Sequence, residues 1–144
     1  ILNLLMIKKI KLLLVFFLLP AIVSCSGTGT KTRPSISQSD KGNTNLFFSR
    51  DGGFIGGGVL AKIEVNGNEI AKLGTKEYTR YTVSDNFRIQ VSGAGIGGMT
   101  MGSDSISGIM NNSNYFYIIG VKQGLFSAKF TINETTESGY KQSQ

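Results

Sequence analysis

The chain has 144 residues, with 15 Lys and Arg against 9 Asp and Glu, one Cys and no His. The lack of histidine excludes a hydroxyl–imidazole dyad and a histidine-ligated zinc centre. A single cysteine excludes an intramolecular disulfide, and the dispersed basic residues do not form the dense patch typical of nucleic-acid binding. We therefore expect no catalytic residues, no metal, no cofactor and no nucleic-acid partner.

The N-terminal segment has the composition of a bacterial export signal. Three lysines between positions 8 and 11 precede an apolar run over 12–22, which is too short for a stable membrane span of roughly 20 residues. Pro20 interrupts a helix near the end of this run and gives a peptidase access to the small residues that follow. We expect residues 1–24 to be a cleaved signal peptide. Two starts are compatible with the sequence: Met6, with residues 1–5 as upstream translation, or an unusual start codon ahead of it.

Cys25 ends this segment and is the most informative residue of the chain. The sequence Ile22-Val23-Ser24-Cys25 resembles the processing box of bacterial lipoproteins, in which the cysteine is joined to diacylglycerol and the chain is cut before it. The resemblance implies lipidation of Cys25, palmitate-type acylation and a membrane as partner. The alternative is an uncleaved membrane anchor with a chance cysteine.

Ser26 bears on the destination of the exported protein. By resemblance to enterobacterial sorting, a residue other than Asp after the lipidated cysteine implies transport to the outer membrane. We therefore expect an anchor in the outer membrane facing the periplasm if the cell has two membranes. Otherwise we expect the anchor on the outer face of the cell membrane.

Residues 25–45 are rich in Ser, Thr, Gly, Lys and Gln and poor in apolar residues. Such a composition is typical of a flexible linker, because it offers little apolar surface to bury. We expect the lipidated cysteine to be followed here by a flexible tether that lifts the domain off the bilayer.

From Leu46 onward the apolar residues recur with a period of two, and no window outside the signal sustains a 3.6-residue period. Asn66-Gly67 predicts a tight hairpin turn, because both positions accept positive φ. Residues 115–121 are apolar on both faces, which predicts a central strand covered on both sides. The expected strands are 46–48, 61–65, 69–73, 76–83, 87–91, 105–110, 115–121 and 126–132.

About seven or eight short strands at this spacing predict a small antiparallel all-β sandwich over residues 46–133, with a flattened barrel as the alternative. Residues 134–144 form a polar tail that we expect to fray. The expected core residues are Phe47, Ile63, Val65, Ile70, Leu73, Phe87, Ile89, Val91, Tyr117, Ile119, Phe130 and Ile132.

Two glycine clusters, 52–58 and 93–98, interrupt the strands. The second follows a strand, as a dinucleotide-binding turn does, but residues 99–104 lack the helical apolar stripe that such a turn requires. We interpret both clusters as flexible loops at one end of the sandwich, which would form a patch for a ligand or an envelope protein partner if they lie together. The candidate residues are Gly53, Ile55, Gly57, Gly95, Ile96 and Met99.

The glycine clusters also support an alternative function. They contain small-xxx-small spacing, which drives helix packing in membranes. The alternative is therefore a membrane-active protein that inserts or oligomerises through segments 52–58 and 93–98.

The carboxylates fall in expected turns or on outward strand positions, and no pair has a spacing that suggests acid–base catalysis. We interpret them as solvated charges. They include Asp51, Glu64, Glu69, Glu77, Asp85 and Asp104.

Four segments, 47–50, 63–73, 75–81 and 114–118, follow one another in a layout that is similar to a bacterial family, domain of unknown function 2846. Residues 84–86 stand where that family has a Pro-Gly turn, and 93–98 is an insertion. The hairpin pattern also recurs in surface-associated sandwich domains with a Pro-Glu-Gly-Ala signature. The resemblance implies a small β-sandwich lipoprotein or secreted domain and no known catalysis, so we expect a non-enzymatic binding or assembly module.

Overall fold

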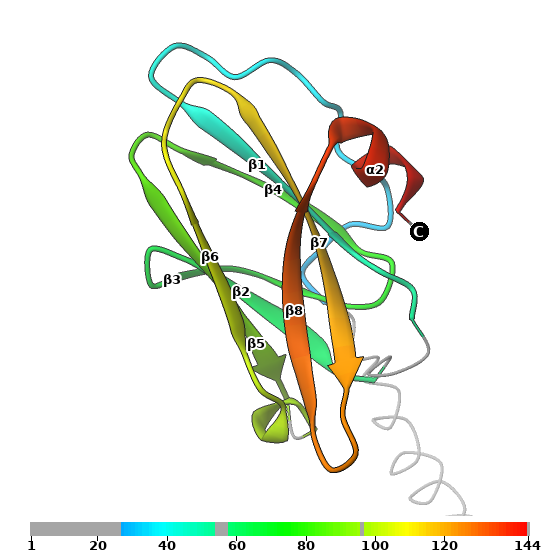
Figure 1. Cartoon of the computed structure of the whole chain (residues 1–144). Coiled ribbons are helices and arrows are strands. Elements are labelled where there is room, and N and C mark those ends of the chain that lie inside the picture. Colours follow the sequence, from blue (N-terminus) through cyan, green and yellow to red (C-terminus); the bar gives the residue numbers. More distant parts are fainter. Residues whose placement is uncertain (1–26, 54–57, 96, 144) are drawn as a thin grey trace, which may run out of the picture.

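The period-two pattern of the sequence corresponds to two facing β-sheets in the computed structural model, which describes residues 27–53, 58–95 and 97–143. Within these residues the strand order is β4-β1-β7-β8 in one sheet and β3-β2-β5-β6 in the other (Figure 1). The predicted small all-β sandwich is confirmed. Its strands are β1 (Thr44–Arg50), β2 (Leu60–Val65), β3 (Asn68–Leu73), β4 (Tyr78–Val83), β5 (Phe87–Ala94), β6 (Asp104–Gly108), β7 (Asn114–Gln123) and β8 (Ala128–Thr135), with a 3-10 turn η2 (Gly98–Thr100) and a short helix α2 (Glu137–Gln142).

The strand pairing agrees with the sequence prediction at the β2–β3 turn and at strand β7. Asn66 and Gly67 have φ angles of 50° and 81° and join β2 to β3, so the predicted tight hairpin turn is confirmed. Strand β7 lies between β1 and β8, as predicted from its two apolar faces. The sheet differs from a purely antiparallel one because β1 and β7 run parallel.

The main core lies between the two sheets and contains ten of the twelve predicted core residues. The two others differ in position. Ile70 is only partly buried, and Phe47 is buried on the outer face of its sheet. Leu46 and Phe48 point into the main core instead, because successive side chains of a strand face opposite sides of the sheet.

The outer face of the β4-β1-β7-β8 sheet is covered by a second, smaller core. Phe47, Tyr78, Phe116 and Tyr140 form this cluster, and Ile36 packs against it. The Phe47 and Phe116 rings stack with their centroids 5.2 Å apart. All seven residues of β1 are therefore buried, since both faces of the strand are covered.

The predicted frayed tail over 134–144 is wrong for its described part. Strand β8 continues to Thr135, and α2 follows with Tyr140 fully buried against the outer face of the sheet. The Thr136 side chain caps α2 by accepting a hydrogen bond from the Gly139 backbone N–H at 3.1 Å. The capping residue and one buried aromatic ring hold the helix in place.

The predicted flexible tether is also wrong over residues 27–43, which we call the strap. The Thr28 backbone N–H donates to the Lys72 carbonyl of β3 at 2.7 Å, and the Thr30 N–H donates to the Tyr78 carbonyl of β4 at 2.9 Å. The strap then runs along the sandwich, and near its far end the Gly42 N–H donates to Asn112 Oδ1 at 2.5 Å (Figure 1). It thus clamps the two sheets together.

The turns gather at two ends of the sandwich. At the tip end, strands β1, β3, β5 and β7 end and β2, β4, β6 and β8 begin. The β7–β8 turn forms the lowest point of this end in Figure 1. The opposite end carries the β2–β3 turn, the β4–β5 turn and the segment between β6 and β7.

Candidate functional site

The tip end brings together the start of the described chain, the flanks of both glycine clusters, the β3–β4 turn and the exposed β7–β8 turn. It is therefore the region where the predicted site residues and the chain segment next to Cys25 meet. Its interior, its glycine-rich edge and its β7–β8 turn differ in chemistry.

The interior of the tip end is held by Arg50, which is 2% exposed. From the end of β1, its Nη1 donates to the Val59 carbonyl and, at 2.8 Å, to the Leu73 carbonyl of the facing sheet. Its guanidinium carbon lies 5.3 Å from the centre of the Phe130 ring. Burial lowers the pKa of Arg50, while the charges of Asp51 and Glu77 act in the other direction. Arg50 thus connects the two sheets beneath the tip end.

Glu77 is the one carboxylate among those predicted to be solvated that is buried, with 3% exposure. Its Oε2 accepts a hydrogen bond from the Gly74 N–H at 2.7 Å, and its Oε1 lies 3.5 Å from Lys31 Nζ. The same ammonium group donates to the Thr75 carbonyl at 2.7 Å. The prediction of a solvated charge is wrong here because the strap covers the β3–β4 turn.

Gly27 packs directly on this turn. A Cβ at this position would overlap both Glu77 Oε2 and the Lys72 carbonyl, so a side chain does not fit. Cys25 lies only two residues earlier in the sequence, outside the described residues. The structure therefore shows the path of the chain from Gly27 onward, two residues after the predicted lipidation site.

The flanks of the two glycine clusters lie side by side, as the predicted common patch requires. Leu60 at the start of β2 pairs with Ala94 at the end of β5. The Val59 side chain also lies against Gly97 and Gly98. These contacts connect the two clusters through residues that the sequence analysis had not singled out.

The candidate residues differ in their exposure and in whether the structure describes them. Gly53 and Gly95 are exposed, and Gly95 has a φ of +84° that favours glycine. Met99 lies in η2. The remaining candidates fall outside the described residues, and these are Ile55, Gly57 and Ile96.

Part of the second glycine cluster is more constrained than the predicted flexible loop. Gly93 belongs to β5, and a Cβ on it would overlap the backbone carbonyl of Gly98. Glycine is required here because two backbone segments approach closely. Gly93 and Gly97 therefore do not share a helix face, which the small-xxx-small interpretation of this pair needs.

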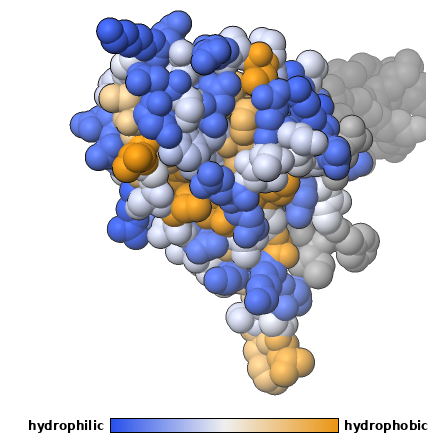
Figure 2. Space-filling model, turned by 45° about the horizontal axis from the view of Figure 1, so that its top comes forward, coloured by the Kyte–Doolittle hydropathy of each residue, from blue (hydrophilic) through white to orange (hydrophobic). Residues whose placement is uncertain are grey.

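The β7–β8 turn carries the most exposed apolar side chains of the described chain. Leu125 is 94% exposed and Phe126 is 100% exposed, so the predicted strand that began at Phe126 is wrong at its start. The turn is closed by a 2.7 Å hydrogen bond from the Gly124 N–H to the Ser127 carbonyl. Figure 2 shows an apolar protrusion at the lower extremity of the molecule, where Figure 1 places this turn.

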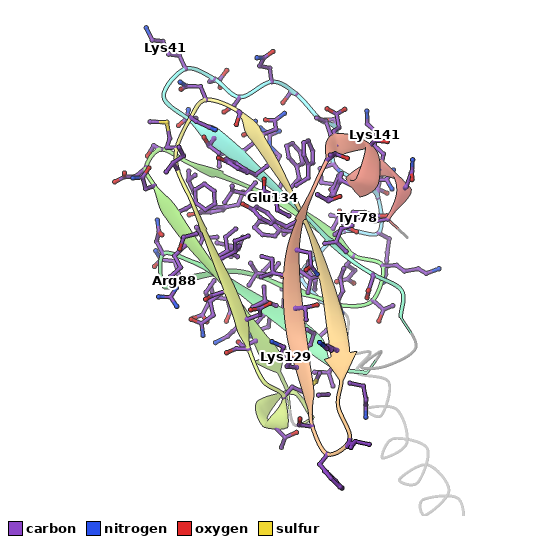
Figure 3. The ribbon with its side chains drawn as sticks, viewed as in Figure 1. Lys41, Tyr78, Arg88, Lys129, Glu134 and Lys141 are labelled. Carbon is purple, nitrogen blue, oxygen red and sulfur yellow. The ribbon has the colours of Figure 1, made fainter. Side chains whose placement is uncertain are left out.

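Two lysines flank the turn. Lys122 of β7 and Lys129 of β8 are direct cross-strand partners, and both are exposed. Figure 3 places Lys129 in the lower half of the view, on the strand that leads up from the turn. A shallow hollow of about 400 Å³ lies beside the turn and is lined by both lysines, Thr100 and Gly102.

Two further hollows lie away from the tip end. One of about 320 Å³ is bordered by polar residues of the strap, including Ser37, and by Asn112 and Asn114. The other, of about 180 Å³, lies beside the β2–β3 turn at the opposite end. Across residues 27–53, 58–95 and 97–143, no group of three His, Cys, Asp or Glu side chains gathers as a metal site would require.

Comparison with known proteins gives no match to a family model, a curated protein or a solved structure. The resemblance to domain of unknown function 2846 therefore stays a prediction. Within the described part of the chain, none of the helices has the length and apolar character needed to span a bilayer.

Proposed function

We propose that this protein is a lipid-anchored protein of the bacterial envelope whose β-sandwich serves as a non-enzymatic binding or assembly module. The lipoprotein-like box ending at Cys25 supports the anchor. The observation that carries the proposal is the fixed position of Gly27, which lies against the β3–β4 turn at the tip end.

This position determines what a lipid at Cys25 would do to the domain. Two residues span at most about 7 Å of extended chain, so the lipidated residue would lie next to the tip end. A flexible linker of about 20 residues would instead separate the domain from the bilayer by an average of about 25 Å. The anchor would therefore hold the domain at the membrane in a restricted orientation.

The same geometry suggests where an envelope partner would bind. With the tip end at the bilayer, the opposite end and the polar hollow beside the strap face away from the membrane. Ser37, Asn112 and Asn114 supply hydrogen-bonding groups around that hollow. These groups suit a polar ligand or a loop of another envelope protein.

The anchor is tested by replacing Cys25 with Ser in cells labelled with palmitate. We expect the variant to lose the label and to leave the membrane fraction, because one thiol carries the attachment. Ser26→Ala is the matched control and should keep both properties. A Cys25→Ser protein that is still labelled and still membrane-bound would contradict the proposal.

The destination is tested by separating the membranes of the native host on a density gradient. If the host has two membranes, we expect the wild-type protein in the outer-membrane fractions. Confinement to inner-membrane fractions would contradict this assignment while leaving the lipid anchor intact.

A further inference from the structure

We propose that the β7–β8 turn, residues 124–127, is a second membrane contact. Leu125 and Phe126 would enter the boundary between headgroups and acyl chains of an anionic bilayer, and Lys122 and Lys129 would lie against lipid phosphates. This inference rests on the proposed lipid anchor at Cys25, which brings the tip end to the bilayer.

The turn exposes its apolar side chains to water. Leu125 and Phe126 are almost completely exposed, whereas the other large apolar side chains of the described residues are mostly covered. The next most exposed one, Ile109, is 61% exposed and lies at the opposite end. Two adjacent apolar side chains at the extremity of a hairpin gain by leaving water, and a bilayer surface provides that environment.

The surroundings of the turn are positively charged. Lys122 and Lys129 face each other across the two strands, an arrangement that is unfavourable without a counterion. Neither lies within ion-pair distance of a carboxylate in the described part of the chain. Lipid phosphates would supply the missing negative charge, and lysines near an anionic bilayer are attracted to it.

The turn lies at the end of the sandwich where the strap begins. The described chain begins at Gly27, against the same end of the sandwich to which the β7–β8 turn belongs. Lys31 and Lys76 are also exposed at this end, around the β3–β4 turn. A lipid anchor and an apolar turn flanked by lysines would therefore face one bilayer together.

The shape of the turn favours a bilayer over a protein partner. Figure 2 shows the apolar surface here as a narrow protrusion rather than a broad face. Two side chains cannot supply the roughly 1,000 Å² or more that a specific protein interface buries. Shallow insertion needs only a few apolar side chains, with basic residues at the level of the headgroups.

The test uses the absence of Trp from the chain. Phe126→Trp places a single tryptophan at the turn, and Ile109→Trp places one at the opposite end as the matched control. Each full-length protein is purified in its lipidated form and reconstituted on vesicles of phosphatidylcholine with phosphatidylglycerol, with and without brominated acyl chains. Flotation reports the anchor, and tryptophan quenching reports the position of each end.

We expect both proteins to float. The emission of Phe126→Trp should shift to shorter wavelength and fall roughly twofold with brominated lipid, because the ring would lie about 5–10 Å into the interfacial region. Ile109→Trp should stay unquenched. Adding Lys122→Gln and Lys129→Gln to Phe126→Trp should reduce the quenching on vesicles with phosphatidylglycerol and leave it unchanged on phosphatidylcholine alone.

A floating protein in which Phe126→Trp stays as unquenched as Ile109→Trp overturns the inference and leaves the lipid anchor in place. Quenching that is equal with and without phosphatidylglycerol overturns the role of the lysines. If the protein carries no lipid and does not float, the proposed function fails and the inference fails with it.

Discussion

The two ends of the sandwich are built from different chemistry. At the opposite end, polar side chains close the turns. Asn66 Oδ1 accepts from the Arg88 N–H at 2.8 Å, Asn86 Oδ1 accepts from the Met110 N–H at 3.0 Å, and Thr44 Oγ1 accepts from the Asn111 N–H at 3.0 Å. At the tip end, glycines permit close backbone packing and the β7–β8 turn exposes two apolar side chains.

This difference shows which end exposes an apolar surface that a partner could cover. The polar groups that close the turns of the opposite end are used in bonds within the protein. Leu125 and Phe126, by contrast, make the tip end apolar where nothing in the fold requires it. Substitutions at the two ends should therefore separate effects on stability from effects on binding.

The largest expected effect is on the interior of the tip end. Arg50→Met should lower the free energy of unfolding by about 3–5 kcal/mol, because it leaves the Val59 and Leu73 carbonyls without their buried donor. Arg88→Met, at an exposed position, should change it by less than about 0.5 kcal/mol. Urea unfolding followed by circular dichroism measures both. Equal effects would show that Arg50 does not hold the sheets together.

A smaller effect is expected from the glycines of the tip end. Gly93→Ala should destabilise the domain by about 1–3 kcal/mol, since the added methyl group would meet the Gly98 backbone. Gly58→Ala should cost less than about 0.5 kcal/mol, because no atom lies within 4 Å of the added carbon. Thermal unfolding of the two variants distinguishes them. If Gly58→Ala is the more damaging change, the close approach of β5 and η2 is not what stabilises this end.

The smallest changes in the free energy of unfolding are expected from one exposed position at each end. Asn86→Ala should cost about 1 kcal/mol, because it removes the acceptor for the Met110 N–H. Phe126→Ser should leave the free energy of unfolding within about 0.5 kcal/mol of the wild type, since the ring is fully exposed. Differential scanning calorimetry compares the two. A large loss of stability in Phe126→Ser would mean that the turn has a structural role.

The sequence was sufficient for the sandwich itself. Alternating residues such as Ile89 and Val91 identify strands directly, and Asn66-Gly67 identifies one turn, because these signals are local. The alternation misled at Phe126, where the pattern of β8 continues into an exposed turn. A periodic pattern does not show where a strand stops if the turn residues happen to fit it.

The parts that could not be predicted depend on contacts between distant segments. Ile36 and Tyr140 are single apolar residues in polar surroundings, and their partners lie on the outer face of a sheet formed elsewhere in the chain. The burial of Arg50 and Glu77 has the same origin. No local pattern reports that a charged side chain will be covered by a strap. That the β7–β8 turn and the start of the strap lie at the same end of the sandwich likewise emerges only from the assembled fold.

We propose that the tip end, and not the opposite end, faces the membrane. A lipidated Cys25 would have no reactive thiol, so Ser127→Cys and Asn112→Cys would each give one site for a nitroxide spin label at the two ends. Power-saturation measurements on the vesicle-bound protein compare access to dissolved oxygen with access to a water-soluble nickel complex. We expect a label at position 127 to be protected from nickel and a label at position 112 to be accessible to it. Equal exposure of both labels to nickel would contradict it.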